Sequence, residues 1–142
     1  MMAKKLKLTF ERGGVVYAVL NEKDAPNMVA QFCATLPRTD DMLHGRYAGP
    51  AMFINTGLEN VTPENLVGRK WVGMITVTLG NRNHPQHAMH MFYSYRREIK
   101  SSNDEIYLAQ VEDKYFPLFE EIGDRVWGHC PEKVTIELVE ED

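Results

Sequence analysis

The sequence has no long apolar segment. Its 142 residues contain no run near the roughly 20 hydrophobic residues that cross a bilayer. The opening stretch MMAKKLKLTF is charged, but it has neither an apolar core nor a small-residue cleavage site, so it does not resemble a secretion signal. We therefore expect a cytoplasmic protein that has no membrane partner.

Cysteine is scarce, since the chain has only Cys33 and Cys130. A chain of this length buries enough surface to fold without disulfides, and this cysteine usage is typical of a reduced, intracellular protein. Cys130 follows His129, but neighbours in sequence do not make a catalytic dyad, because the base must reach the thiol in space.

Positive charge is not in excess either. The chain has 16 Lys and Arg against 20 Asp and Glu, a formal net charge of −4. A nucleic-acid partner requires a basic face, and the short clusters at 4–7 and 96–97 are too small to provide one. Gly13-Gly14 has the pattern of a hairpin turn, so we expect neither a phosphate-binding loop nor a cofactor.

The chain does contain many alternating apolar residues, which predict strands with one buried face. The expected strands cover residues 5–10, 15–20, 42–47, 51–56, 71–79, 88–95, 106–111 and 133–139. Residues 57–70 are predicted to be a loop, with a single helical turn at 63–65.

Two helices are predicted between these strands. The first opens at Asp24, whose carboxylate serves as the N-cap, and ends at Pro37. Its apolar stripe consists of Val29, Phe32, Cys33 and Leu36. The second covers the apolar residues between 116 and 122 and stops at Gly123. Short strands with two helices and frequent turns indicate a mainly β fold, a closed barrel of about eight strands with two short helices capping its ends.

Several segments also match a known family. VLNEKDAP at 19–26 has an acidic residue and a proline at a helix start, His44-Gly45-Arg46 follows it, and the apolar stretch 116–123 precedes Val134-Thr135-Ile136. These segments, in this order, resemble the cyclophilins, whose fold is an eight-stranded closed barrel with a helix over each end. The resemblance implies that fold, and it places Arg46 where cyclophilins carry their active-site arginine.

Two motifs point to a narrower group. One is His-x-Arg-aromatic-small-Gly at 44–49, and the other is Pro63-Glu64-Asn65 ahead of a strand led by Gly73. Both resemble an uncharacterised family of bacterial and archaeal proteins with a cyclophilin-like fold. The resemblance extends from about Leu6 to about Leu138, so it implies a single cyclophilin-like domain over residues 1–142.

The departures from the cyclophilins concern activity more than fold. Phe53 and Asn55 stand where cyclophilins carry a phenylalanine and a glutamine, but the preceding turn differs in length and the amide is one methylene shorter. Trp127 and His129 follow the second predicted helix, whereas the tryptophan and histidine over the cyclophilin proline pocket precede it. A shared fold does not by itself imply a shared activity. If the chain is an enzyme, the resemblance implies a peptidyl-prolyl isomerase whose active site is altered.

The segment HGRYAGPAMF at 44–53 supplies most candidate binding residues. Residues two apart on a strand share a face, so His44 and Arg46 are expected to point the same way, over an apolar floor that includes Phe53. The candidate ligand-binding residues are His44, Arg46, Tyr47, Phe53, Asn55 and His90.

Arg46 suits two kinds of ligand. A guanidinium that donates to a prolyl nitrogen weakens the amide conjugation behind the isomerisation barrier of about 18–20 kcal/mol. The same group can instead clamp a small carboxylate, with His44 assisting. A structural alternative pairs Arg46 with a carboxylate such as Glu64.

Three histidines, His84, His87 and His90, raise the question of zinc. Positions three apart on a strand face opposite sides, and Pro85 argues against a helix that starts at His84. We therefore expect no metal site, and we expect His90 to face the mouth of the barrel.

Met89, Met91, Tyr93 and Tyr95 share one face of a predicted strand. Methionine commonly fills cores, but an exposed face of this composition would mark a contact between subunits of a homo-oligomer. Three functions follow from these observations. The leading one is a binder of a small molecule or a proline-containing peptide, and its rivals are a degenerate prolyl isomerase and a structural subunit.

Overall fold

Nine β-strands form one antiparallel sheet within residues 3–80 and 85–141, which the computed structural model describes. Eight of them close into a barrel in the order β2-β1-β9-β3-β4-β7-β6-β8, because β2 also pairs with β8. The eight are β1 (Ala3–Phe10), β2 (Val15–Leu20), β3 (Arg38–His44), β4 (Ala51–Asn55), β6 (Met74–Thr78), β7 (Ala88–Phe92), β8 (Glu105–Val111) and β9 (Glu132–Glu141). The predicted fold class, a closed and mainly β barrel, is confirmed.

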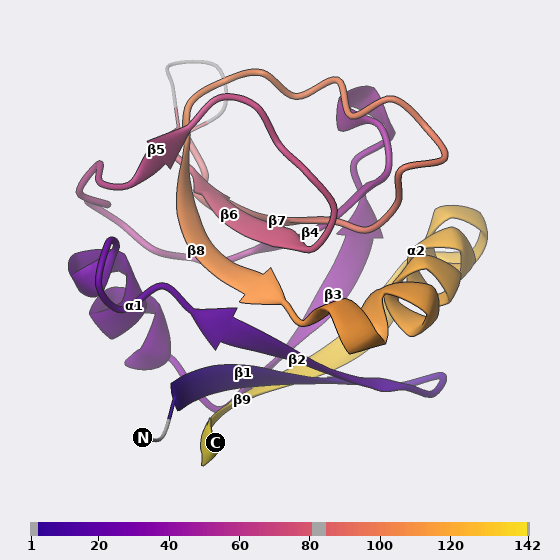
Figure 1. The fold of residues 1–142 in the computed structure, drawn as a ribbon, viewed down its shortest axis with the longest axis horizontal. Helices are drawn as coiled ribbons and strands as arrows, with labels where there is room; N and C mark the ends of the chain where they lie inside the picture. Colours follow the sequence, from indigo (N-terminus) through magenta and orange to yellow (C-terminus); the bar gives the residue numbers. More distant parts are fainter. Residues whose placement is uncertain (1–2, 81–84, 142) are drawn as a thin grey trace.

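The remaining elements lie around this barrel. A short strand, β5 (Leu66–Val67), pairs with the start of β8 inside the predicted loop. The helices α1 (Pro26–Cys33) and α2 (Phe116–His129) lie on opposite sides of the barrel (Figure 1). Two 3-10 turns, η1 (Arg46–Ala48) and η2 (Asp113–Tyr115), complete the described elements, none of which is a helix long and apolar enough to span a membrane.

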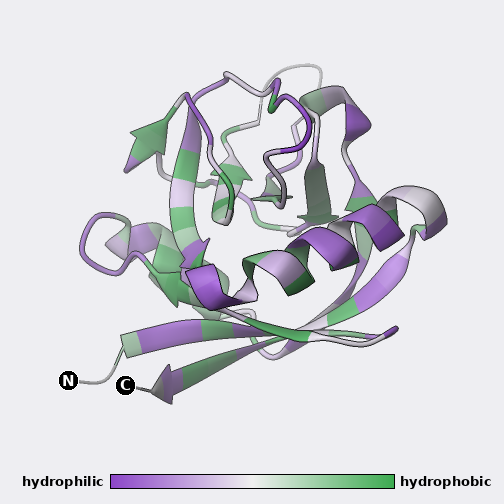
Figure 2. Cartoon of the chain, turned by 45° about the vertical axis from the view of Figure 1, so that its right-hand side comes forward, coloured by the Kyte–Doolittle hydropathy of each residue, from purple (hydrophilic) through white to green (hydrophobic). Residues whose placement is uncertain are grey.

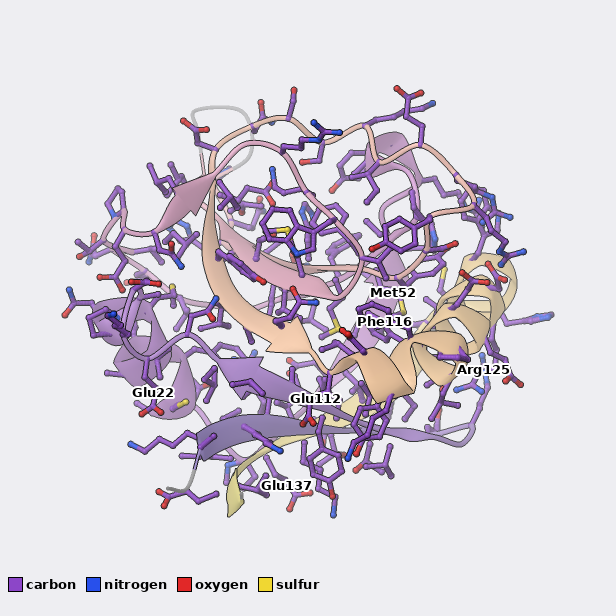
Figure 3. All side chains as sticks on the ribbon, viewed as in Figure 1. Glu22, Met52, Glu112, Phe116, Arg125 and Glu137 are labelled. Carbon is purple, nitrogen blue, oxygen red and sulfur yellow. The ribbon has the colours of Figure 1, made fainter. Side chains whose placement is uncertain are left out.

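Alternate residues of each strand fill the barrel interior. Met52 lies opposite Met91, which lies opposite Ile75, and all three side chains are fully buried. The alternation is visible along β1 and β9, next to the two termini, as hydrophobic and hydrophilic bands (Figure 2). Figure 3 shows Met52 in the middle of the molecule and Glu22 at its periphery. Each large apolar side chain that is buried in this way stabilises the fold by roughly 1.5–3 kcal/mol.

The start of α1 differs from the prediction. The helix begins at Pro26 with Ala25 at the N-cap position, and Asp24 makes no capping hydrogen bond. Instead, Glu64 reaches the helix from the loop before β5: its carboxylate accepts the backbone N–H of Met28 at 2.6 Å and the amide of Asn27 at 3.1 Å. A carboxylate supplied from elsewhere in the fold therefore satisfies one of the free backbone N–H groups that the prediction gave to Asp24.

The strand predicted at 42–47 is also placed differently. β3 begins at Arg38, because residues 38–42 pair with β9, and it ends at His44. The chain then turns: the N–H of Gly45 donates to the carbonyl of Ala51, and residues 46–48 form η1. Arg46 is consequently not on a strand, and the two-residue alternation that was expected to align it with His44 does not apply.

Gly123 does not stop the second helix, as was predicted. It lies inside α2, which continues to His129, and it is buried against the ring of Tyr93. A Cβ atom at this position would overlap the Cγ and Cδ atoms of that ring. The glycine therefore serves close packing of the helix on the barrel.

The Met-Tyr face cannot be a subunit contact of the kind that was predicted. Met89, Met91 and Tyr93 are fully buried in the barrel core, and only Tyr95 is exposed, at 72%. The methionines act as core filler, which was the favoured interpretation, and the subunit contact was its alternative.

The close packing at Gly123 leads to a stability prediction. Gly123→Ala should lower the free energy of unfolding by about 3 kcal/mol, the upper end for overpacking a core, because the new methyl group meets the Tyr93 ring. Urea denaturation measures this change. Gly128→Ala in the same helix is the matched control, since nothing lies within 4 Å of its added Cβ, and it should be neutral or stabilising by up to about 1 kcal/mol. Equal effects of the two substitutions would contradict the prediction.

Candidate functional site

The outer face of the barrel wall formed by β4, β7, β6 and β8 carries the candidate site. Phe53 lies opposite His90, which lies opposite Thr76, and Thr78 lies opposite Glu105. Directly opposed residues of antiparallel strands share a face. These side chains therefore stand on the other side of the wall from the methionines of the core.

The segment 93–104 and η1 cover this outer face. The N–H of Lys100 donates to the carbonyl of Ala48 at 2.9 Å, which ties the segment to η1. Gly49, with a φ of +95°, packs so closely on the backbone of Glu98 that a Cβ atom would overlap its carbonyl oxygen. Glycine is required at this position for both reasons.

Lys70 fastens the same segment from a second side. Its side chain is buried, and its ammonium donates to the carbonyls of Gly68 at 2.6 Å and Asn103 at 2.7 Å. Burial lowers the pKa of this ammonium, whereas the charges of Glu105 and Asp104 act in the opposite direction. A buried cation needs partners of this kind, so Lys70 joins the loop before β6 to the segment 93–104.

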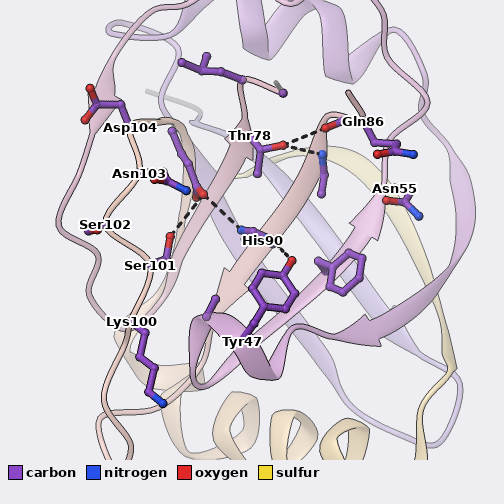
Figure 4. Close-up of a pocket in the computed structure, with 16 residues that line it drawn as sticks. Tyr47, Asn55, Thr78, Gln86, His90, Lys100, Ser101, Ser102, Asn103 and Asp104 are labelled. Atoms are coloured by element: carbon purple, nitrogen blue, oxygen red, sulfur yellow. Dashed lines mark hydrogen bonds and ion pairs between the residues drawn. The ribbon is translucent and has the colours of Figure 1, made fainter. Parts of the chain in front are cut away.

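A pocket of about 840 Å³ lies between the wall and its cover. Small-molecule sites commonly measure roughly 300–1,000 Å³. Figure 4 shows polar side chains from β4, β6, β7 and the segment before β8 around it. The lining residues used below are Tyr47, Phe53, Asn55, His90, Lys100, Ser101, Asn103, Asp104 and Glu105.

A buried histidine and glutamate lie next to each other in this pocket. His90 Nδ1 is 3.5 Å from Glu105 Oε2, while the hydroxyl of Thr76 donates to Glu105 Oε1 at 2.6 Å. Burial by itself would raise the pKa of Glu105. Hydrogen bonding and charge from His90, the Thr76 hydroxyl and the charge of Lys70 outweigh burial, so the pKa of Glu105 lies below its usual value. The carboxylate is therefore ionised at neutral pH.

Aromatic rings surround the other side of the imidazole. The ring centroid of His90 lies 5.9 Å from that of Phe53, 6.0 Å from that of Phe92 and 6.4 Å from that of Tyr47, all at steep angles. The hydroxyl of Tyr47 is 3.4 Å from His90 Nε2. One ring nitrogen thus faces a carboxylate and the other faces a tyrosine at the pocket.

The structure divides the six candidate binding residues into two groups. Tyr47, Phe53, Asn55 and His90 line the pocket. His44 lies opposite Met52 in the β3–β4 pair, whereas Phe53 lies opposite Leu43, so His44 and Phe53 stand on different faces of the wall.

His44 and Arg46 instead meet at the C-terminal half of α2. The hydroxyl of Tyr93 is 2.6 Å from His44 Nε2, and the His44 ring lies 4.4 Å from the ring of Trp127. Arg46 donates to the carbonyl of Trp127 at 2.5 Å and lies over its ring, which Arg97 also contacts. Arg46 is therefore bound to α2. Glu64, the carboxylate that the structural alternative paired with Arg46, instead caps the start of α1.

The electrostatics of this second cluster keep His44 neutral. Burial, reinforced by the charges of Arg46 and Arg97, lowers the pKa of His44 to about 4. Burial raises the pKa of Tyr93 to about 12, so its hydroxyl keeps its proton at neutral pH. His44 Nδ1 is buried without a hydrogen-bond partner among the described residues.

Of the three histidines considered as zinc ligands, the two that the structure describes have other partners. His87 Nδ1 is 2.9 Å from the carbonyl of Thr78, and His90 faces Glu105. His84 lies outside the described residues. Within residues 3–80 and 85–141, no three His, Cys, Asp or Glu side chains gather as metal ligands do.

Sequence reasoning missed Glu105, Thr76 and Lys70. Glu105 opens a strand whose next residues, IYLAQV, are mostly apolar, and a charged residue among such neighbours is a signal for a functional or paired group. Lys70 gave no comparable signal, because its partners are backbone carbonyls.

Neither a scan of protein-family models nor a search of curated proteins returns a match to this sequence. The fold is similar to that of McbB, whose structure was solved in complex with tryptophan, with a TM-score of 0.74 and 14% identity. The match covers 93% of this chain and 44% of McbB, so the chain spans less than half of that protein. It is also similar to the hypothetical protein AF2241 from Archaeoglobus fulgidus, with a TM-score of 0.58 and 13% identity over 95% of this chain and 94% of that one. At these identities, the likeness shows a shared barrel fold.

The neutral His44 leads to a prediction on acid stability. Its pKa of about 4 in the folded state lies below the ordinary value of 6.5, so the unfolded chain binds the proton more readily between these values. The contribution of neutral His44 to the free energy of unfolding is fully present above about pH 6.5 and is lost as the pH falls toward 4. His44→Gln should reduce the loss between pH 7 and pH 4.5 by on the order of 1 kcal/mol, a value that allows for partial solvent screening. Urea denaturation at the two pH values measures it, and an unchanged pH dependence in the variant would show that other groups are responsible.

Proposed function

We propose that this chain is a small-molecule binding domain of cyclophilin-like fold, and that its ligand is a planar heteroaromatic compound of about the size of indole. The pocket between segment 93–104 and the outer barrel wall is the proposed site. The observation that carries the proposal is the arrangement around His90, where aromatic rings stand on one side and a buried, ionised glutamate stands on the other.

The aromatic residues favour a flat ligand. Tyr47 and Phe53 come from η1 and β4 and both line the pocket. Aromatic groups prefer offset or edge-to-face contacts with ring centroids about 4.5–7 Å apart, and a planar ring system makes such contacts with both side chains at once.

The polar lining favours a ligand with an N–H donor and balanced charge. Asn55, Ser101 and Asn103 offer hydrogen-bonding groups, while Lys100 and Asp104 bring opposite charges to the margin. McbB, with a similar barrel, was solved with tryptophan, a zwitterion that contains an indole. Tryptophan and indole are therefore the first compounds to try on this chain.

Prolyl isomerisation, the rival function, has less support. It requires an arginine beside the apolar floor that holds the proline ring, but Arg46 is engaged by Trp127 and does not line the pocket that contains Phe53. A proline-containing peptide would have to bind without that guanidinium.

Binding is predicted to depend on Phe53. Titration of the protein with tryptophan and with indole, followed by two-dimensional NMR, should shift the backbone amides of Phe53, His90 and Glu105. Phe53→Ala should weaken the affinity at least about tenfold, which corresponds to about 1.4 kcal/mol, because it removes one aromatic wall.

Tyr95→Ala is the matched control for this experiment. Tyr95 is an exposed aromatic residue of the segment 93–104 that does not line the pocket, so its removal should leave the dissociation constant unchanged. The proposal fails if neither compound shifts any pocket amide at millimolar concentration. It also fails if both variants weaken binding equally.

A further inference from the structure

A histidine becomes a general base when one ring nitrogen is held by a carboxylate and the other faces a substrate pocket. His90 has this arrangement before the hydrogen bond to the carboxylate is made. Glu105 Oε2 lies 3.5 Å from its Nδ1, which is buried without a hydrogen-bond partner among the described residues, and Nε2 faces the hydroxyl of Tyr47 at the pocket. The side chains of His90 and Glu105 are both buried, so the pair is largely shielded from water.

The glutamate is itself held in place. Thr76 donates to one of its oxygens at 2.6 Å, and Ser101 lies 3.4 Å from the other. A carboxylate held in this way selects the tautomer with the proton on Nδ1 and leaves Nε2 as the acceptor. The His90 contacts to Glu105 and Tyr47, at 3.5 Å and 3.4 Å, are longer than ordinary hydrogen bonds, and catalytic hydrogen bonds commonly tighten only in the substrate complex.

We infer that the pocket catalyses keto–enol proton transfer on a planar aromatic carbonyl compound, an inference that rests on the proposed function. His90 is the general base, Tyr47 is the proton donor and Glu105 is the positioning residue. The substrate class is a carbon acid whose acidic C–H lies next to both a carbonyl group and a ring.

The proposed step is balanced within the pocket. The C–H bond breaks, its proton forms an N–H bond at His90 Nε2, and its electron pair becomes the C=C bond of an enolate. The enolate oxygen takes the proton of the Tyr47 hydroxyl. The imidazolium then returns its proton to the tyrosine oxygen across the 3.4 Å contact, so the protein is restored and the substrate has become its enol.

Four features of the site favour this chemistry. The aromatic walls hold the ring of the substrate, and Glu105 balances the charge of the imidazolium that forms. Of the described lining residues, Lys100 is the one lysine or arginine, and its charge favours the enolate. A buried base that escapes hydration acts more strongly on a C–H bond than one in water.

Oxindole is the probe, because it is planar, indole-shaped and neutral, and it carries a C–H next to both a carbonyl and a ring. In D₂O, base-catalysed enolisation replaces the methylene protons of oxindole with deuterium, which ¹H NMR follows as loss of their signal. Saturation-transfer NMR on the same sample measures binding. The protein should exchange oxindole at least about 100-fold faster than the same concentration of imidazole.

Two variants test the roles of the reacting residues. His90→Gln should bind oxindole within about threefold of the native affinity but exchange it no faster than imidazole. Tyr47 is largely exposed, so Tyr47→Phe should fold normally and lower the exchange rate at least about tenfold with little change in binding. If His90→Gln does not fold, Tyr47→Phe still decides the question.

Glu105→Gln tests positioning through the pH profile. The ionisable groups that face His90 are Tyr47 of η1 and Glu105 of β8, with Lys70 acting on Glu105. A general base acts in its deprotonated form, so the exchange rate should rise with pH to a plateau. Removal of the glutamate charge destabilises the imidazolium, so the inflection should move to lower pH and the maximal rate should fall. A purely structural role would not move the inflection.

The outcomes separate the two proposals. Saturable binding of oxindole with exchange no faster than imidazole overturns the base assignment and leaves the binding proposal standing. Absence of binding overturns both. Fast exchange that persists in both His90→Gln and Tyr47→Phe assigns the proton transfer to other groups and overturns the roles of His90 and Tyr47.

Discussion

The barrel wall formed by β4, β7 and β6 carries large apolar side chains on both faces, and much of the structure depends on this constraint. Its inner face carries Met52, Met91 and Ile75, while its outer face carries Phe53 and Phe92 around His90. A sheet with two apolar faces must be covered twice. The first cover is the barrel itself, and the second is the segment 93–104 with η1. The candidate site exists because this second cover leaves space above the polar residues of the outer face.

The second cover is tied to the rest of the fold at both ends. At its start, Tyr93 leaves β7, packs its ring on Gly123 of α2 and places its hydroxyl on His44. Toward its end, Lys70 holds the carbonyl of Asn103. The helix α2 and the loop before β6 therefore both determine where segment 93–104 lies. His44 and Arg46, which were predicted to bind a ligand together with Phe53, lie in the cluster around Trp127 and contribute to the pocket indirectly by anchoring its cover.

Most of the fold could be predicted from the sequence because its strands and helices follow the local periodicity of apolar residues. Alternation along β1, β2 and β9 identified these strands to within two residues at each end, and the apolar stripe of α1 identified the helix. The errors arose where a distant residue takes over a local role. Glu64 replaces Asp24 at the helix start, and the ring of Tyr93 explains a glycine that otherwise has the pattern of a helix stop. Such contacts have no signature in spacing.

The residues of the candidate site could be predicted where side chains alternate between the two faces of a strand. Phe53, Asn55 and His90 were named from the sequence, and cross-strand register brings them to one face. His44 failed to join them because its register partner is Met52, a fact that depends on the turn length between β3 and β4. Glu105 lies on a strand that begins fifteen residues after His90, and only the β6–β8 pairing places it beside the histidine.

The same register specifies both the pocket and the core. Side chains alternate between the two faces of a strand, so a slip of one residue between β4 and β7 would exchange Phe53 and His90 for Met52 and Met91. It would place an imidazole in the barrel interior and two methionines in the pocket. The free energy of burying the methionines therefore also holds His90 in its place opposite Phe53. Fold likeness at 13–14% identity shows the barrel, but the chemistry of this chain depends on which residues its own register turns outward.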